Sequence, residues 1–350
     1  MGQSPEYKAV DLFCGAGGLS LGLHWAGWKV EIAVEQDSAA STTYRHNFPG
    51  TMFLEKDVRD VCFSDYKGID LVAGGPPCQP FSVAGEQLAE NDPRDMVPAF
   101  VRVVREIRPK SFLMENVPGL LTAKHKTYTS SVVRMFRSLD YEVRVCVFDA
   151  ADYGVPQHRE RVFFLGLRHD MEVPFLLPEP EYGKGKAHPH VTVREALYGT
   201  PADTPNTAKV TYCKNPVLRP SPWAGMLVNG GGRPIHLDEP CQTIPATAGG
   251  NRTHIVDEKG VLREYHRYLM EGGQPRVGEV EGVRRLTARE SARIQSFPDT
   301  FRFLGAKSSI YRQIGNAVPP LLAKAVGLAL KRSLLRVSQP PTLFTKSKAA

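Results

Sequence analysis

Short apolar runs alternate with helix-like segments through the first half of the chain, and this alternation constrains the fold more than any other feature. The predicted strands are 7–13, 30–34, 69–73, 111–114, 143–148 and 161–167. The helix-like segments are about 18–26, 38–46, 95–107 and 128–139. Strands separated by helices are typical of an α/β fold with a doubly wound, mostly parallel sheet. In such sheets ligands bind at the carboxyl ends of the strands.

The sequence changes after about residue 170, where proline and glycine become frequent and long periodic segments are few. We interpret 176–304 as a smaller, loop-rich domain with a connecting helix. Within it, Thr287 and Glu290 form a Thr-x-x-Glu capping box, which predicts the start of that helix.

The chain's two ends are expected to share one domain. We expect 305–336, which contains a final helix from about 319 to 335, to complete the domain formed by 1–175. The polar segment 337–350 is expected to be a disordered tail.

Charge and cysteine usage narrow the class of protein. The net charge of +7 and the pI of about 9.0 favour a polyanionic partner. The six cysteines include no Cys-x-x-Cys pair and no zinc-like spacing with histidine, which indicates a reduced protein without a metal site. No apolar signal segment opens the chain, and charged residues interrupt the apolar stretch at 321–335. We therefore expect a cytoplasmic protein without a membrane span.

Cys78 follows the strand at 69–73 within the sequence Gly74-Gly75-Pro76-Pro77-Cys78-Gln79-Pro80-Phe81-Ser82. The glycines let the backbone turn and the prolines stiffen it, so the loop presents one cysteine at the carboxyl edge of the sheet. Taken alone, Cys78 is either a reactive thiol or a buried, inert one.

A glycine-rich turn follows the first strand, in Asp11-Leu12-Phe13-Cys14-Gly15-Ala16-Gly17-Gly18. Such a turn lets a ligand approach the backbone, although it also serves tight packing. Glu35 ends the next strand, where an acidic side chain holds ribose hydroxyls, and Asp57 suits an adenine amino group. Together these residues indicate an adenosine-containing cofactor, while each carboxylate alone would be an ordinary solvated turn residue.

The chain resembles the cytosine-C5 DNA methyltransferases along nearly its whole length. Six motifs occur in the family's linear order, and the nucleophile loop and the Gly-Asn-Ala-Val-Pro-Pro block are the most specific of them. The motifs are Asp11 to Gly18, Gly75 to Ser82, Glu115-Asn116-Val117, Gln157 to Arg161, Arg285-Leu286-Thr287 through Gln295 to Pro298, and Gly315 to Pro320.

This resemblance implies a mechanism and a cofactor site. Cys78 adds to C6 of cytosine and so activates C5. Glu115 binds N3 in its protonated form, which burial favours. Arg159 holds O2, and Arg161 supports it or contacts phosphate. S-Adenosylmethionine, with S-adenosylhomocysteine as its product, is held by Asp11, Phe13, Gly15, Gly17, Glu35, Asp57, Pro76, Asn316 and Ala317.

The resemblance also implies a duplex DNA partner and a flipped-out cytosine. Segments 229–233 and 242–252 look like the family's two recognition loops, and 82–95 is a candidate lid over the flipped base. The implied DNA contacts are Ser82, Arg233, Thr243, Asn251 and Arg252. Each of them reads a base edge or binds phosphate.

Three other functions compete with this interpretation. An RNA cytosine-5 methyltransferase of the transfer-RNA subgroup would carry Cys-Phe-Thr in the recognition region, and this chain does not. A non-catalytic DNA-binding homologue would not need Cys78, Glu115 and Arg159. A nicotinamide-dependent dehydrogenase explains the glycine-rich turn but not the loop around Cys78. We therefore expect a monomeric, nucleoid-associated prokaryotic modification enzyme, without stable attachment to a companion restriction endonuclease.

Overall fold

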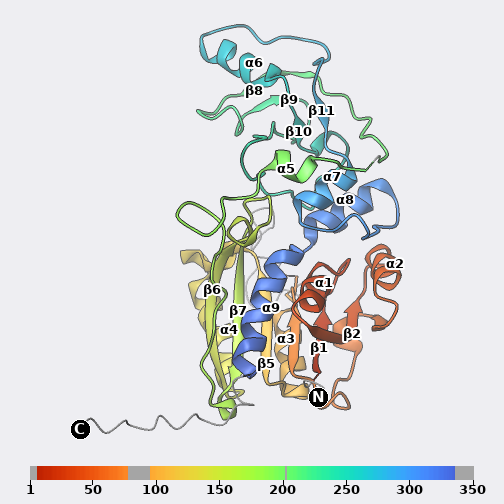
Figure 1. Ribbon diagram of the computed structural model, residues 1–350, viewed down its shortest axis with the longest axis vertical. Coiled ribbons are helices and arrows are strands. Elements are labelled where there is room, and N and C mark those ends of the chain that lie inside the picture. Colours follow the sequence, from red (N-terminus) through yellow and green to blue (C-terminus); the bar gives the residue numbers. More distant parts are fainter. Residues whose placement is uncertain (1–5, 78–94, 202, 336–350) are drawn as a thin grey trace, which may run out of the picture.

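The computed structural model describes residues 6–77, 95–201 and 203–335 of the chain. Cys78, Ser82, all but the last residue of the segment 82–95 and the tail 337–350 lie outside the described residues. The described part has two lobes, which stand one above the other in Figure 1. We call the lower one, which contains the large sheet, the sheet lobe, and the upper one, residues 193–285, the small lobe.

Seven strands of the described part form the sheet, in the order β3-β2-β1-β4-β5-β7-β6. Neighbouring strands are parallel except at β7, which runs antiparallel to both β5 and β6. The strands are β1 (Tyr7–Leu12), β2 (Trp28–Glu35), β3 (Met52–Glu55), β4 (Leu71–Gly74), β5 (Ser111–Asn116), β6 (Tyr141–Asp149) and β7 (Glu160–Arg168). The expected mostly parallel α/β fold is therefore confirmed.

Two features of the sheet were not predicted, and each has a local cause. β3 is four residues long, lies at the edge of the sheet and has no buried side chain, so its pattern is too short to mark a strand. β6 and β7 are joined by 150–159, which contains a 3-10 turn (Ala150–Tyr153) and no crossover helix. Parallel strands need a crossover of about a dozen residues, so this short connection makes β7 antiparallel.

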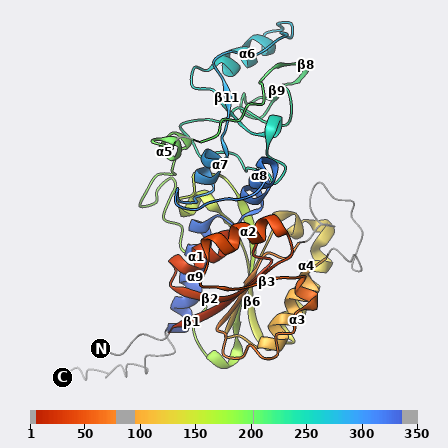
Figure 2. The same ribbon diagram turned by 90° about the vertical axis from the view of Figure 1, so that its right-hand side faces the viewer.

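Helices cover both faces of the sheet, with α1 and α9 on one side and α3 and α4 on the other (Figure 2). They are α1 (Gly18–Trp25), α2 (Ser38–Asn47), α3 (Val97–Ile107), α4 (Lys126–Arg137) and α9 (Pro320–Leu335). Phe112 of β5 packs with Phe100 and Phe136, whereas the next residue, Leu113, joins the cluster that contains Leu330. A strand covered on both faces requires this alternation. In the described part, no helix is long and apolar enough to cross a membrane.

The small lobe consists of short elements around two small apolar clusters. Its elements are α5 (Val193–Leu197), β8 (Tyr212–Val217), β9 (Met226–Val228), β10 (Ile255–Val256), α6 (Val261–Met270) and β11 (Arg284–Arg285). The helices α5 and α6 were not predicted. The helical spacing of Leu262, Tyr265 and Leu269, which α6 buries, was the signal that could have revealed it.

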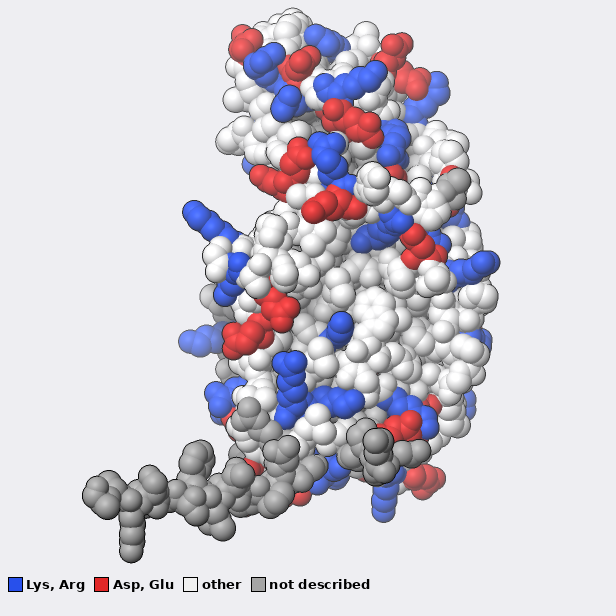
Figure 3. Space-filling view, in the orientation of Figure 1, with Lys and Arg blue, Asp and Glu red and all other residues white. Residues whose placement is uncertain are grey.

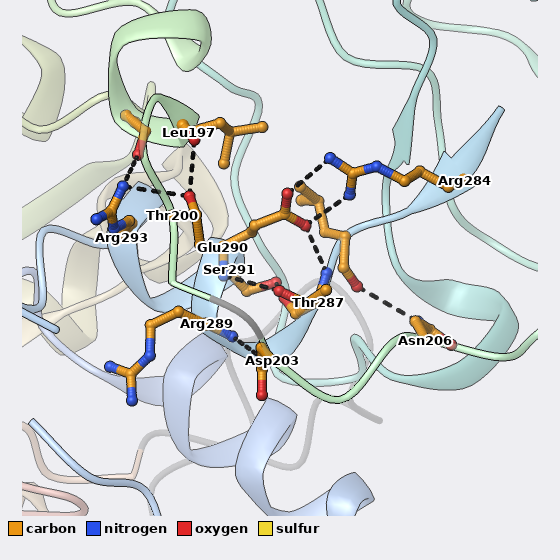
Figure 4. Close-up of polar contacts among 12 residues, drawn as sticks. Leu197, Thr200, Asp203, Asn206, Arg284, Thr287, Arg289, Glu290, Ser291 and Arg293 are labelled. Carbon is orange, nitrogen blue, oxygen red and sulfur yellow. Dashed lines mark hydrogen bonds and ion pairs between the residues drawn. The ribbon is translucent and has the colours of Figure 1, made fainter.

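Two helices, α7 (Ala288–Ile294) and α8 (Lys307–Asn316), lie between the lobes (Figure 1). The predicted capping box is confirmed: the Glu290 N–H donates to Thr287 Oγ1 at 3.1 Å, and the Thr287 N–H donates to the Glu290 carboxylate at 2.8 Å. Figure 4 shows that this carboxylate also pairs with Arg284, while Arg293 reaches Thr200 in the connection after α5. The start of α7 is thus fixed by its cap and Arg284, and its end is fixed by Arg293.

The division of the chain at 176 and 304 stays a prediction. The segment that follows α7 packs on the sheet lobe, because Phe297 and Phe301 share an apolar cluster with Tyr44 of α2. The ring of Phe301 lies 6.0 Å from that of Phe48, edge to face. The chain therefore returns to the sheet lobe before α8 begins.

Candidate active site

A cavity of about 390 Å³ opens at the carboxyl ends of β1, β2, β4 and β5. Asn316 and Ala317 reach it from the end of α8, so segments from both ends of the chain meet there. Of the residues predicted to hold a cofactor, Gly17 does not line the cavity. The others do: they are Asp11, Phe13, Gly15, Glu35, Asp57, Pro76, Asn316 and Ala317.

Gly17 is needed for packing instead. It precedes α1 with a φ of 100°, and a Cβ there would lie 2.3 Å from Cε2 of Phe48. A larger residue would therefore push the start of α1 away from the chain that follows α2. Phe13 has a φ of 55°, which is uncommon for a residue other than glycine, and it lies at the cavity wall.

Glu35 anchors the glycine-rich turn to the end of β2. One carboxylate oxygen accepts the Gly15 N–H at 2.9 Å, and the other accepts the N–H groups of Gln36 and Asp37 at 2.9 and 2.8 Å. These donors hold the side chain in one orientation at the cavity. A carboxylate oxygen has more than one lone pair, so hydroxyl groups of a ligand can still donate to it.

Asp57 is paired within its own segment. Arg59 donates to both carboxylate oxygens, with Nη2 2.6 Å from Oδ2, and the Arg59 N–H donates to Oδ1 at 2.8 Å. The hydrogen bonds from Arg59 lower the pKa of Asp57. Asp57 is therefore an ionised acceptor at the cavity edge, and an amino group that binds there shares it with Arg59.

Glu115 is the penultimate residue of β5 and faces the loop that leads to Cys78. A Cβ on Gly75 would lie 3.0 Å from Glu115 Oε2, and Asn116 Nδ2 holds the Pro76 carbonyl at 3.2 Å. Glu115 Oε1 pairs with Arg161 Nε at 3.0 Å. Burial nevertheless raises the pKa of Glu115, against the lowering effect of the nearby arginines. Its environment therefore favours the protonated form more than water does.

The structure places the two arginines of the Gln157-to-Arg161 motif differently. Arg159 is 2% exposed, and its guanidinium donates to the carbonyls of Ile244, Gly315 and Ala317 at 3.1, 2.7 and 3.1 Å. These three bonds from its two terminal nitrogens hold the backbone, while its Nε has no hydrogen-bond partner among the described residues. Arg161, two residues along β7, is the arginine that reaches Glu115. Residue spacing alone could not separate them, because side chains two residues apart in an extended chain are expected on the same side.

Gln157 and His158 join the sheet lobe to the second predicted recognition loop. The Ile244 N–H donates to Gln157 Oε1 at 2.9 Å, and the His158 N–H donates to the Cys241 carbonyl at 2.8 Å. Thr243, predicted to contact DNA, donates its hydroxyl to the His158 carbonyl at 2.9 Å. Its hydroxyl proton is therefore engaged in attaching the loop.

Arg233, Asn251 and Arg252 are exposed on loops of the small lobe that run side by side. The Ile255 N–H donates to the Arg233 carbonyl at 3.0 Å, and the Arg233 N–H donates to His254 Nδ1 at 3.3 Å. Gly232 allows this approach, because a Cβ there would lie 2.0 Å from the Thr253 carbonyl oxygen. The structure thus brings the two predicted recognition loops together.

Arg285 is a structural residue that sequence reasoning missed. It is 2% exposed and donates to the Thr253 carbonyl at 2.9 Å and to the carbonyl and side chain of Asn229 at 3.0 and 2.9 Å. It therefore ties the start of one loop to the end of the other. Arg285 lies in a recognised motif, but nothing in its spacing shows which backbone groups it binds.

The chain is similar to known proteins along nearly its whole length. The family model for C-5 cytosine-specific DNA methylase matches residues 7–332. Type II methyltransferase M.NgoMIV of Neisseria gonorrhoeae is 36% identical over 329 residues, which cover 94% of this chain and 98% of the relative. Type II methyltransferase M1.HphI of Haemophilus parahaemolyticus is 36% identical over 342 residues, which cover 92% and 86%. A solved variant of Spodoptera frugiperda DNMT2 shares the fold, with a TM-score of 0.70 at 18% identity, covering 93% of this chain and 100% of that one.

Proposed function

This chain belongs to the C-5 cytosine-specific DNA methylase family, and we propose that it methylates C5 of one cytosine in a short duplex DNA site as the modification enzyme of a restriction–modification system. The observation that carries the proposal is the Glu115–Arg161 pair, which lies beside the cavity at the loop leading to Cys78. The Type II methyltransferases among its relatives, matched along nearly the whole chain, support the restriction–modification role.

The cavity fits S-adenosylmethionine. It combines an acidic acceptor for ribose hydroxyls, Glu35, with Asp57 for an adenine amino group and with the apolar side chains of Phe13 and Pro76. Asn316 and Ala317 close it from α8. When bound, this cofactor supplies an electrophilic methyl group.

Cys78 is the proposed nucleophile. It follows Pro77, which lines the cavity, although Cys78 itself lies outside the described residues. The electron pair of its thiolate forms a bond to C6 of cytosine, the π electrons of the C5–C6 double bond shift into the ring, and C5 then takes the methyl group while S-adenosylhomocysteine leaves. Loss of the C5 proton and cleavage of the bond from sulfur to C6 restore the ring and the thiolate.

Glu115 and Arg161 would hold the other edge of the base. A protonated Glu115 donates to N3 and stabilises the charge that develops there, and the raised pKa of this carboxyl suits that role. We transfer the O2 contact first assigned to Arg159 to Arg161, because the Arg159 guanidinium already serves three carbonyls. Arg159 then positions the cavity wall and the recognition loop.

The small lobe would read the DNA site. C5 of cytosine is inaccessible to Cys78 inside a duplex, so the base must be flipped out, at a cost of a few kcal/mol. Arg233, Asn251 and Arg252 are exposed on neighbouring loops and suit contacts to base edges or phosphates. Ser82, also assigned to DNA, lies outside the described residues.

The experiment that tests this function combines two assays. Plasmid DNA from cells that express the chain is sequenced after bisulfite treatment, and the purified protein is given radiolabelled S-adenosylmethionine with matched DNA and RNA. We expect one short DNA sequence to be methylated at one cytosine, and Cys78→Ala to abolish transfer while cofactor binding persists. Methylation of RNA alone, or activity in Cys78→Ala, would contradict the proposal.

A loop exchange tests where the specificity lies. Residues 229–252 are replaced by the matching segment of a relative that methylates another sequence. We expect the chimera to methylate the relative's site at a similar rate, because the sheet lobe supplies the chemistry. An active chimera that still methylates the original site would place the determinants elsewhere.

A further inference from the structure

Asp11, at the end of β1, has a carboxyl group that the surrounding protein satisfies only in part. The side chain is fully buried and lines the cavity. Oδ2 accepts a 2.6 Å hydrogen bond from Ser20 of α1, whose hydroxyl also bonds Tyr44 of α2 at 2.7 Å. Oδ1 has no hydrogen-bond partner among the described residues. A buried carboxylate oxygen in this situation is unstable unless it gains a donor or a proton.

The other acidic side chains of the cavity have partners. Glu35 accepts three backbone N–H groups. Asp37 pairs with Arg312 at 2.8 Å, Asp57 pairs with Arg59, and Glu115 pairs with Arg161. The charged group that acts on Asp11 is another acid, Glu35. Among the described residues, Asp11 is thus the cavity carboxyl that a positively charged ligand would complete.

Resting on the proposed function, we propose that Asp11 receives the positive charge of S-adenosylmethionine at its free Oδ1 and gives up a proton to solvent as the cofactor binds. Burial, together with the charge of Glu35, raises the pKa of Asp11 to about 7, so the free protein carries this proton for part of the time at neutral pH. A cation next to Oδ1 favours the carboxylate and lowers that pKa.

The direction of the pH dependence follows from this difference. The complex holds fewer protons than the free protein below about pH 7, so the binding constant rises with pH there, by up to about tenfold per pH unit. Above about pH 7 Asp11 is already ionised in the free protein, and its contribution levels off.

The groups that face Asp11 determine which controls are needed. Burial raises the pKa of Cys14 and of Tyr44 well above their usual ranges, so both stay neutral in this interval. Ser20 does not titrate. Glu35 adds negative charge from β2. Across the cavity, Glu115 also has a raised pKa and could exchange a proton, so it must be tested separately.

The test is isothermal titration calorimetry with S-adenosylmethionine at pH 6, 7 and 8, in buffers of different ionisation enthalpy, which counts the protons exchanged. We subtract the number of protons that Asp11→Asn releases on binding from the number that the wild type releases. The expected difference is nearly one proton at pH 6, about half a proton at pH 7 and little at pH 8. The subtraction removes the proton exchange that both proteins share. Glu115→Gln should keep the release.

Two further ligands show which charge is sensed. S-Adenosylhomocysteine keeps the amino group and lacks the sulfonium, and methylthioadenosine lacks both charges. Release with the first ligand assigns the amino group, release with S-adenosylmethionine alone assigns the sulfonium, and release with methylthioadenosine would contradict both.

A second variant covers the case in which Asp11→Asn fails to fold or to bind. Ser20→Ala removes the donor to Oδ2, so the midpoint of the release should move to higher pH. Equal proton exchange in wild type and Asp11→Asn, or an unmoved midpoint in Ser20→Ala, would overturn the inference. Absence of any cofactor binding by the wild type would instead contradict the proposed function.

Discussion

The two lobes are stabilised by different means. In the sheet lobe, the strands satisfy one another's backbone groups, and two large apolar clusters fill the space between sheet and helices. In the small lobe, β9, β10 and β11 are two or three residues long, and buried side chains such as Arg285 satisfy loop carbonyls. The cavity therefore lies on a scaffold that strand pairing and apolar packing hold together, whereas the two predicted recognition loops are held by a few buried polar residues.

Charged side chains are also distributed differently over the two lobes. On the face seen in Figure 3, acidic and basic side chains are interspersed over the small lobe, while the middle of the sheet lobe is largely uncharged. The net charge of +7 is therefore not gathered into one patch on this face.

The largest effect is expected at the edge of the sheet lobe that we propose to be catalytic. Glu115→Gln should slow methyl transfer by about 10²–10⁴-fold, because the amide cannot supply a proton to N3. Affinity for cofactor and duplex should change little, as the residue volume is kept. Single-turnover kinetics measure the rate, and Glu142→Gln, at a partly exposed position of β6 that does not line the cavity, is the control. A near-native rate would remove Glu115 from the mechanism.

The contrast between the lobes also explains what the sequence could predict. Strands such as β4 and β5 and the cavity residues at their ends follow from apolar runs and turn residues, so they were predicted correctly in position. The backbone contacts of Arg159 and Arg285 could not be predicted, because each arginine binds carbonyls far away in the sequence. Arg159 and Gly315, whose carbonyl it binds, are 156 residues apart in the sequence, and no local pattern predicts such a contact.

The next effect is on the stability of the sheet lobe. Phe112 is fully buried and stacks on Phe136 with ring centroids 4.0 Å apart, so Phe112→Ala should lower the free energy of unfolding by about 3–5 kcal/mol. Urea unfolding followed by circular dichroism measures it. The control is Val147→Ala, 46% exposed on β6, which should change the value by less than about 0.5 kcal/mol. Equal losses in both variants would contradict the packing argument.

A smaller effect on stability, with a larger effect on specificity, is expected in the small lobe. Arg285→Met leaves the carbonyls of Thr253 and Asn229 without their donor, at a cost of about 1–3 kcal/mol for each one that water cannot reach. The loops should then lose their fixed separation, so discrimination between the cognate site and its single-base variants should fall while cofactor affinity stays the same.

Filter binding of cognate and variant duplexes measures that discrimination. Arg263→Met, on the exposed side of α6, removes the same charge from the same lobe without touching either loop and is the control. Discrimination by Arg285→Met equal to that of the control would show that the loops hold their arrangement without this arginine.

The smallest expected effects are losses of stability when the N-cap threonine of α5 or α7 is replaced. Thr192 caps α5 and Thr287 caps α7, each with a glutamate three residues later. Replacing a capping threonine by alanine costs about 0.5–2 kcal/mol. Thr192→Ala should fall at the low end, because α5 has five residues and its box is exposed to water. Thr287→Ala should fall at the high end, because the buried Glu290 also holds Arg284 at 2.8 Å.

Thermal unfolding of both alanine variants measures the difference between the two losses of stability. Thr→Ser at each position keeps the hydroxyl and should restore stability. The junction helix α7 contacts both lobes, so its cap should matter to the unfolding of the whole molecule, whereas the cap of α5 should affect the small lobe alone. An equal or larger loss for Thr192→Ala would mean that the junction does not transmit stability between the lobes. The two lobes would then differ in how they are stabilised, but α7 would not couple them.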